Sequence, residues 1–392
     1  MVVLLLIVLA IYSLLNFYIA RRGAQALAAY PVARGVFLAV FIGLALAYPL
    51  GRILMSLARG LPSSVLIKVG SFHMVVMLYG FLGVVLIDIV RLANAFVPFF
   101  PKALTARPGP AGLVLFLVTA GTILLTIVAG AVNAGRLRTA ELDLRIPKKA
   151  GTRDGLTIVL ASDFHLGSVV GKSRLAKAVT KINALGPDIV FLAGDIVDES
   201  VSEREEAEYG QIMTGLRAPL GIYAVPGNHE TFAGLEKALA CLRSCGIVVL
   251  EDEAVMIADS FVVVGRRDRT SLKPGGETRL AIRAILAKHG FDSRLPVILL
   301  DHQPMNLDEA GEAGVDLQLS GHTHNGQIFP VGLINRWVFE LNWGYLRKGD
   351  THYYVTSGVG TWGPPVRTGS SAEVVRIRLS FGDPLRPALT AN

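Results

Sequence analysis

The sequence predicts a multi-pass α-helical membrane region followed by an α/β domain built as a two-sheet αββα sandwich. Two observations predict this arrangement. Four long apolar stretches lie within the first 135 residues, and short β-rich runs alternate with helical segments from about residue 138 onward. We therefore expect a four-helix transmembrane region at residues 1–135 and a separate α/β domain at residues 136–392.

The positive charge of the chain is confined to its N-terminal third. Residues 1–140 hold eleven Lys and Arg but a single acidic residue, Asp88, whereas the rest of the chain carries a formal charge of −3. Lys and Arg commonly flank membrane spans. Because the α/β domain has no basic excess, nucleic acid is not an expected partner. The sequence shows no sign of an obligate protein partner either.

Each apolar stretch is long enough to cross a hydrocarbon core of ~30 Å, which takes about 20 helical residues. The stretches cover residues 2–20, 36–58, 69–93 and 112–134. The first lacks a basic segment before it and leads straight into further spans, so we expect a retained helix and not a cleaved signal peptide. The protein is therefore expected in the cell membrane. The Lys and Arg counts of alternate loops are too similar to predict its orientation.

Two polar residues occur within the third span. His73 lies near one end of the predicted span and Asp88 near the other. We expect both side chains to reach the membrane interfaces. A polar pathway of a transporter or channel is the alternative interpretation.

The α/β domain is predicted from its alternation of short runs. Buried strands are expected at residues 156–161, 188–193, 222–225, 296–300 and 315–319, and further strands at 254–258, 261–265, 352–356 and 372–379. Helices are expected at residues 172–185, 203–216, 234–244 and 277–289. This pattern predicts two sheets covered by helices.

Polar clusters directly follow the five predicted buried strands. They are Asp163-Phe-His165, Gly194-Asp195, Gly227-Asn-His-Glu230, Asp301-His302 and Gly321-His-Thr-His324. Taken singly, the first four clusters are typical of a surface loop, a turn, a helix cap and a buried or loop histidine, whereas Gly-His-x-His is more specific. Ligand sites in α/β sheets form where the carboxyl ends of strands meet, so all five clusters are expected at one crevice. Their imidazole, carboxylate and amide groups suit Mn, Fe, Zn, Co or Ni better than Ca or Mg.

These donors are too many for one tetrahedral ion. Two divalent ions about 3.5 to 4 Å apart, bridged by a carboxylate, would use them all. Such a pair polarises a phosphoryl oxygen and lowers the pKa of a bridging water, so that a hydroxide can attack phosphorus. The clusters therefore predict hydrolysis of a phosphate ester. The glycines at 194, 227 and 321 would let the backbone turn tightly from strand to ligand.

The five clusters resemble the calcineurin-like metallophosphoesterase superfamily, whose pattern is D-x-H, G-D-x-x-D, G-N-H-[DE], a single H and G-H-x-H. The resemblance covers about residues 138–380 and includes GDIVD at 194–198. GHTHNGQIFP at 321–330 and SGVGTWGPPVRTGSSAE at 357–373 are similar to membrane-attached bacterial members and to the transmembrane metallophosphoesterases of animals.

The resemblance implies a role for each matching residue. One ion would be held by Asp163, His165, Asp195 and His324, and the other by Asp195, Asn228, His302 and His322, so that Asp195 bridges them. His229 would protonate the leaving oxygen, which makes His229 and Asp195 the expected catalytic residues. Asp198 and Glu230 would orient the imidazoles of histidine ligands.

The substrate class is narrowed by departures from other branches. Protein Ser/Thr phosphatases of the superfamily continue the second motif with Arg-Gly, whereas Glu199-Ser200 follow here, which argues against a phosphoprotein substrate. UDP-diacylglucosamine pyrophosphatases have Arg at the position of His229, so this chain resembles that enzyme class less. Membrane anchoring favours a lipid or lipid-linked phosphate ester. The alternatives are a phosphatase for soluble nucleotides or envelope phosphates, and a membrane sensor or scaffold with residual activity.

Aromatic residues gather soon after the last metal motif, at Trp337, Phe339, Trp343 and Tyr345. Trp and Tyr favour the boundary between lipid and water. We expect this segment either to rest at the bilayer interface or to receive an acyl chain. An ordinary loop covering the core is the alternative.

Overall fold

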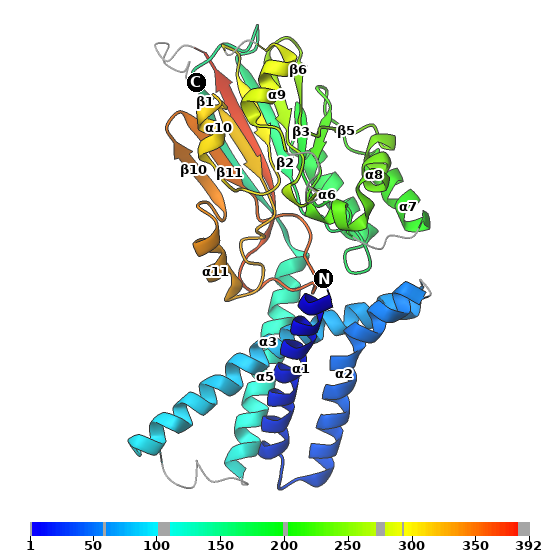
Figure 1. Cartoon of the computed structure of the whole chain (residues 1–392), viewed down its shortest axis with the longest axis vertical. Helices are drawn as coiled ribbons and strands as arrows, with labels where there is room; N and C mark the ends of the chain where they lie inside the picture. The colour runs from blue at the N-terminus through cyan, green and yellow to red at the C-terminus, as the bar shows by residue number, and fades with distance from the viewer. Residues whose placement is uncertain are drawn as a thin grey trace. The chain divides into compact units, whose positions relative to one another are not determined.

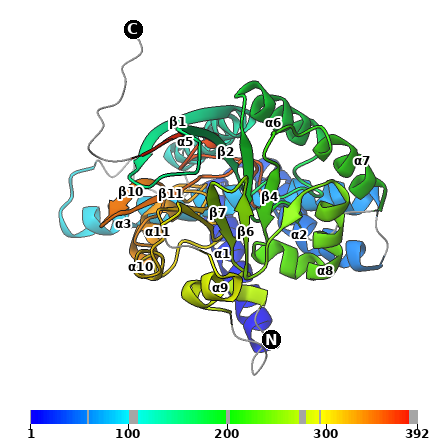
Figure 2. The same ribbon diagram turned by 90° about the horizontal axis from the view of Figure 1, so that it is seen from above.

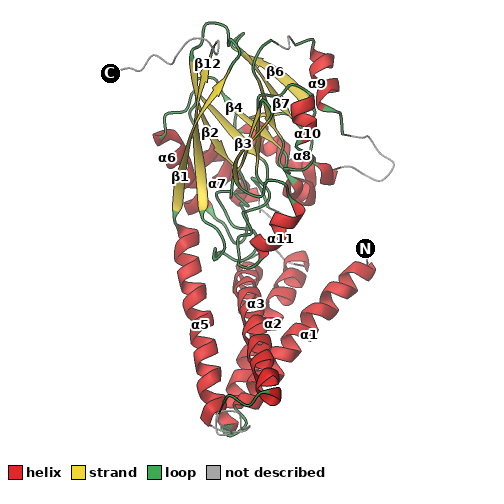
Figure 3. Ribbon diagram, turned by 90° about the vertical axis from the view of Figure 1, so that its left-hand side faces the viewer, coloured by secondary structure: helices red, strands yellow, loops and turns green. Residues whose placement is uncertain are grey.

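The chain divides into two compact units, Met1–Val132 with Gly363–Val366, and Asn133–Trp362 with Arg367–Asn392 (Figure 1). The computed structural model describes residues 2–57, 60–100, 110–198, 203–271, 279–291 and 294–382. Within these ranges every strand belongs to the second unit, as the strand colouring of Figure 3 shows.

Within the described residues, four long helices form most of the first unit. They are α1 (Val2–Ala26), α2 (Pro31–Leu57), α3 (Leu61–Phe96) and α5 (Pro110–Gly135). All four are long and apolar enough to cross a membrane, which confirms the four predicted apolar helices. Many large apolar side chains lie on the outer surfaces of these helices, among them Leu14 and Leu125. A helix that is apolar around its surface fits a lipid environment and not water.

The side chain of His73 does not reach the surface of the helical unit. Helix α3 begins at Leu61, so His73 lies well inside the helix, and its side chain is buried. Its Nε2 atom is 2.7 Å from Oδ1 of Asn16 in α1, and its ring packs edge-on against Phe41 of α2. Polar groups inside a membrane pair with one another because lipid offers no partner. His73 therefore connects three helices.

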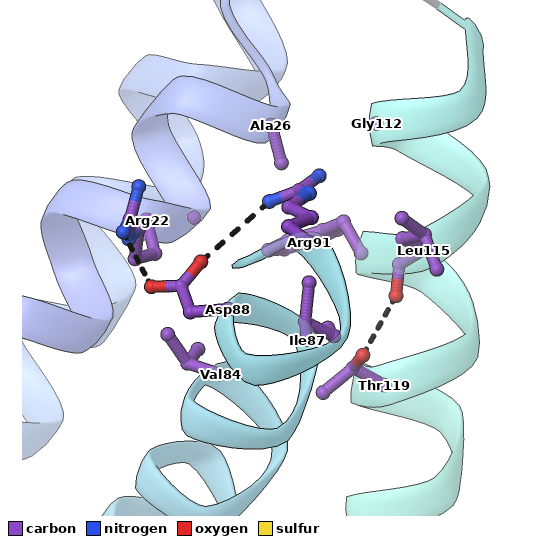
Figure 4. Close-up of a pocket in the computed structure, with 11 residues that line it drawn as sticks. Arg22, Ala26, Val84, Ile87, Asp88, Arg91, Gly112, Leu115 and Thr119 are labelled. Carbon is purple, nitrogen blue, oxygen red and sulfur yellow. Dashed lines mark hydrogen bonds and ion pairs between the residues drawn. The ribbon is translucent and has the colours of Figure 1, made fainter. Parts of the chain in front are cut away.

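Asp88 has cationic partners within the helical unit. Its carboxylate pairs with Arg22 of α1, accepts a hydrogen bond from the Tyr18 hydroxyl at 2.5 Å, and lies 3.9 Å from Arg91. Figure 4 shows Asp88 between the two arginines, in a pocket whose lining includes Gly112 of α5. Pairing of this kind lowers the free energy of placing a charge in a membrane helix.

Two six-stranded mixed sheets form the framework of the second unit. The first has the order β1-β12-β2-β3-β4-β5 and the second β10-β11-β9-β8-β7-β6. The first sheet contains β1 (Leu137–Ile146), β2 (Gly155–Ala161), β3 (Ile189–Ala193), β4 (Ile222–Val225), β5 (Val248–Val249) and β12 (Ala372–Phe381). The second contains β6 (Glu253–Ile257), β7 (Phe261–Gly265), β8 (Val297–Leu300), β9 (Leu317–Ser320), β10 (Gly344–Lys348) and β11 (Thr351–Val355).

Parallel pairing places the ends of the buried strands together. Strands β2 to β5 run parallel to one another, as do β7, β8, β9 and β11. The antiparallel pairs are β12 with β2, β6 with β7, and β10 with β11. Because parallel strands end at the same edge, residues that follow β2, β3 and β4, or β8 and β9, share an edge of their sheet.

The main core lies between the two sheets, where Ile158 and Phe191 of one sheet pack in the same cluster as Val263 and Leu300 of the other. Helices cover both outer faces (Figure 2). Those on the first sheet are α6 (Lys172–Ala184), α7 (Glu203–Met213) and α8 (Asn228–Ser244), and those on the second are α9 (Ile282–His289) and α10 (Asp308–Glu312). The predicted αββα sandwich is confirmed.

The remaining differences from the predicted elements are local. Strands β1, β5 and β10 were not predicted, and α8 begins at Asn228 instead of residue 234 because a kink at Gly234 joins an extra turn to the helix. Residues 277–278 of the predicted fourth helix lie outside the described residues, and α9 begins at Ile282. A short 3₁₀ turn, η1 (Arg269–Ser271), and helix α11 (Val331–Val338) complete the described part of the unit.

Candidate metal centre

The predicted ligands all follow the ends of parallel strands. Asp163 and His165 follow β2, Asp195 follows β3, Asn228 follows β4, His302 follows β8, and His322 and His324 follow β9. Donor atoms from the two sheets come within 4.8 Å of one another in three overlapping groups of His and Asp side chains. The structure therefore brings every predicted metal ligand to one place, at the carboxyl edges of both sheets.

One cluster joins the β2 and β9 ends. Nε2 of His165 lies 2.9 Å from Nε2 of His324. Oδ1 of Asp163 lies 3.4 Å from Nε2 of His324 and 3.9 Å from Nε2 of His165. All three side chains are buried. Three groups that carry lone pairs thus converge on one point.

A second cluster joins the β3, β4, β8 and β9 ends. Oδ2 of Asp195 lies 3.1 Å from Nε2 of His302, while Oδ1 of Asn228 lies 3.2 Å from that nitrogen and 2.9 Å from Nδ1 of His322. The Nδ1 atom of His302 is 2.7 Å from the carbonyl oxygen of Ala193. An Nδ1–H that donates to this carbonyl leaves the Nε2 lone pair free to bind a cation.

Asp195 connects the two clusters. Its Oδ2 atom, which approaches His302, is also 3.9 Å from Nε2 of His165. Its Oδ1 atom accepts a hydrogen bond of 2.8 Å from the backbone N–H of His229. The carboxylate is therefore held in one orientation between both groups of donors.

The donor set fits divalent cations. At most one proton can lie between the facing Nε2 atoms of His165 and His324, whereas a metal ion would use both lone pairs. Burial lowers the pKa of His165 and of His322 to about 4 and moves the pKa of His324 well below its usual range. These imidazoles are therefore neutral at pH 7, which is the form that binds metal.

The backbone at the site is strained. Five of the predicted ligands have positive φ angles: Asp163 (52°), His165 (50°), Asp195 (52°), His322 (71°) and His324 (50°). Residues other than glycine rarely adopt this conformation, and it concentrates at functional sites. Two glycines make room for the turns, because a Cβ atom on Gly227 would overlap Asp195 and one on Gly321 would overlap Asp163. The surrounding fold thus holds these side chains in unfavourable backbone conformations.

His229 and Asp198 form a pair at the edge of the site. Nδ1 of His229 lies 2.7 Å from Oδ1 of Asp198, and the two side chains are 12% and 26% exposed. The His229 ring packs edge-on against His165, with 4.5 Å between ring centroids. Burial by itself would lower the pKa of His229, but the Asp198 hydrogen bond and the nearby Asp195 outweigh it and raise that pKa. Asp198 thus contacts a histidine, as the resemblance implies.

The structure corrects the expected role of Glu230. Its carboxylate accepts hydrogen bonds from backbone N–H groups and not from an imidazole. The donors are Asp195 at 3.0 Å, Ile196 at 2.6 Å, Val197 at 2.9 Å and Gly227 at 2.7 Å. The turns that follow β3 and β4 contain buried backbone N–H groups, which need hydrogen-bond acceptors, and the Glu230 carboxylate supplies them. Glu230 therefore positions the backbone of two ligand loops.

Sequence reasoning assigned no role to Arg367. Its side chain is fully buried and donates hydrogen bonds to the carbonyl oxygens of Ser357 at 2.8 Å and Gly360 at 2.7 Å, and its Nη2 lies 3.4 Å from Nδ1 of His324. The Gly360 N–H in turn donates to the carbonyl oxygen of Asp163 at 2.7 Å. Arg367 therefore supports both ligand loops of the first cluster. The signal was its place as a single charged residue among Gly, Pro and Ser at 357–371.

The comparisons with known proteins agree with this geometry. A family model described as "Calcineurin-like phosphoesterase" matches residues 156–326, from β2 to just beyond His322 and His324. An uncharacterized metallophosphoesterase of Aquifex aeolicus is 37% identical over 237 residues, which are 60% of this chain and 87% of the relative. The chain therefore belongs to the calcineurin-like metallophosphoesterase family. This family uses divalent metal ions, and the clustered His and Asp side chains fit them.

Two further relatives bear on the N-terminal helices. A transmembrane protein with metallophosphoesterase domain from Danio rerio is 33% identical over 269 residues, or 64% of this chain. An uncharacterized metallophosphoesterase of Helicobacter pylori is 34% identical over 234 residues, or 57% of this chain. The matched region spans 60% of each of these two relatives. Four long apolar helices and a relative named as a transmembrane protein indicate a membrane protein.

Proposed function

We propose that the chain is a membrane-anchored hydrolase of phosphomonoesters or phosphodiesters that works with two divalent metal ions. The observation that carries this proposal is the pair of donor clusters that share Asp195. Asp163, His165, Asp195 and His324 would hold one ion, and Asp195, Asn228, His302 and His322 the other. The donor chemistry admits Mn, Fe, Zn, Co or Ni.

Bound ions of this kind polarise a phosphoryl oxygen and activate water for attack on phosphorus. The residues of the chain supply the remaining steps. His229 is in reach of both clusters and partly exposed, so it protonates the oxygen of the leaving group. Asp198 holds the His229 ring through Nδ1 and so directs Nε2 towards the substrate. Asp195 keeps its place through the His229 backbone N–H.

The proposed substrate is a lipid or lipid-linked phosphate ester. Four membrane-spanning helices precede the catalytic domain, and a single residue, Arg136, separates α5 from β1 along the chain. A tether this short keeps the domain beside the bilayer, where lipid phosphates are concentrated. An enzyme for soluble phosphates gains no rate from such a tether.

The test uses the full chain in nanodiscs and follows the hydrolysis of a chromogenic phosphodiester and a chromogenic phosphomonoester. We expect chelation to abolish turnover and Mn, Zn or Fe to restore it. Asp195→Asn should stay inactive after metal is added. Asp350→Asn is the matched control, because the Asp350 side chain is fully exposed, and it should behave as the wild type. Two bound ions without turnover of these esters or of lipid phosphates would favour the scaffold.

A further inference from the structure

Helix α11 presents its apolar face to the outside. Large apolar side chains occupy most of the helix and the residue before Pro330, and every one is exposed. They form what we call the α11 surface: Phe329, Val331, Leu333, Ile334, Trp337 and Val338. Trp337 is 90% exposed and Ile334 59% exposed. No residue of α11 is buried. A helix on a water-soluble domain normally turns such residues towards the core.

The opposite face of α11 holds it on the domain through small and polar groups. With about 100° between successive residues, the apolar positions of α11 fall within an arc of about 160°, and Gly332, Asn335 and Arg336 fill the other side. Gly332 packs against the backbone of Asn325 and Gly326. Asn335 Nδ2 donates a hydrogen bond of 2.9 Å to the carbonyl oxygen of Thr323. The orientation is therefore built into the domain, and it leaves the apolar arc without a protein partner among the described residues.

The same contacts connect α11 to the metal centre. Thr323 lies between His322 and His324, the two predicted ligands after β9. Just beyond α11, the ring of Phe339 packs edge-on against His322 at 5.8 Å between centroids. Trp343 is held in place by a hydrogen bond of 3.0 Å from its Nε1 to Glu373. A membrane or molecule that binds the α11 surface is thus brought close to the loop that carries His322 and His324.

We propose that the α11 surface inserts into the lipid bilayer in which the chain is anchored and brings the metal centre to phosphate esters at the lipid surface. Lipid is the expected occupant, because only one residue connects α5 to the domain and the membrane anchor therefore keeps the domain beside a bilayer. The surface has the composition of an interfacial helix, with Trp and aliphatic residues on one face and Arg336 on the other. This inference rests on the proposed function for its substrate but not for the insertion itself.

Fluorescence tests the insertion independently of catalysis. The chain has three tryptophans, so the double variant W343F/W362F leaves Trp337 as the only one. In nanodiscs of brominated phosphatidylcholine, we expect its emission to fall about twofold or more, with bromines near the headgroup quenching best because interfacial helices lie at a shallow depth. The difference in quenching between wild type and Trp337→Phe measures the same contact without the double substitution. Emission that bromine leaves unchanged would overturn the proposal. Quenching by acrylamide in water would then distinguish a Trp337 exposed to water from one shielded by a protein partner.

Kinetics test the consequence for the substrate. In the variant I334S/W337S we expect the rate on a lipid phosphate ester, relative to the rate on a water-soluble chromogenic ester, to fall about tenfold or more, since burial of one side chain of this size changes a partition equilibrium by about that factor. Val248→Ser removes an exposed apolar residue of β5 and should leave the ratio unchanged. Quenching without a change in the ratio would leave α11 a membrane contact and remove its role in substrate delivery. If wild-type protein with metal hydrolysed neither ester, the proposed hydrolase function would be refuted, and the quenching result would still stand.

Discussion

Asp198 and Glu230 are neighbouring carboxylates of the metal centre that act on different groups. Asp198 contacts the imidazole of His229, whereas Glu230 accepts hydrogen bonds from four backbone N–H groups. The first arrangement affects proton transfer, and the second affects the shape of the ligand loops. Substitution of each residue should therefore change a different measured quantity.

Asp198→Asn should lower kcat about 10- to 100-fold, because an amide stabilises the protonated His229 ring less well than a carboxylate does. The metal content should not change, since Asp198 is not among the predicted ligands. Steady-state kinetics on a chromogenic diester, together with metal analysis, would check both statements. An unchanged kcat would show that Asp198 does not act through His229.

Glu230→Gln should lower the stability of the domain and its metal content together. The glutamine NH₂ group would face backbone N–H donors, and each buried donor left without an acceptor costs about 1 to 3 kcal/mol. Thermal unfolding of the full chain, followed through its intrinsic fluorescence, measures the change in Tm. Glu236→Gln, an exposed residue of the same helix, is the matched control. A variant with the Tm and metal content of the wild type would contradict the assigned role.

The starts of α6 and α8 compare two elements of similar geometry. Gly171 precedes α6 with φ −105° and ψ −175°, and Gly227 precedes α8 with φ −104° and ψ −171°. A Cβ atom on Gly171 would meet open space, whereas one on Gly227 would overlap Asp195. The same turn is therefore free to vary at one helix and sterically constrained at the other.

Gly227→Ala should lose bound metal and activity, because the new methyl group displaces the carboxylate that both clusters share. Gly171→Ala should keep both properties. Metal analysis of the purified full-length variants, alongside hydrolysis of a chromogenic ester, makes the comparison. Equal activity in the two variants would mean that the Asp195 loop can move without loss of function.

The prediction of elements succeeded where burial was complete. Strands β2, β3, β4 and β8 are largely buried and appear as short, nearly continuous apolar runs, while β9 is fully buried but alternates leucine with polar residues. Strands β1, β5 and β10 lie at sheet edges, and their runs are short or mix charged residues with apolar ones. Edge strands are stabilised mainly by pairing with a neighbour, which a local pattern does not record.

At the scale of the whole molecule, the four apolar helices are expected to cross the membrane, and an even number of spans predicts both chain termini on the same side. Epitope tags at the two ends should therefore be digested together, or protected together, when protease is added to sealed vesicles. Digestion of both tags after permeabilisation is the control. Digestion of one tag alone would show an odd number of spans.

The sequence by itself determined the order of the two parts, the four long apolar helices and which residues the structure gathers into the two donor clusters. Apolar length and strand-end motifs are local properties of the chain, so they can be read without knowledge of the fold. The convergence of five strand ends also followed from sequence, because parallel strands share an edge.

Only the tertiary structure decided the partners of Glu230, the burial of His73, the contacts of Arg367 and the outward face of α11. Each depends on groups far apart along the chain. Asn16 and His73, for example, are separated by 57 positions, and Arg367 and His324 by 43. A side chain's partner is set by packing between elements, and residue type alone does not specify that packing.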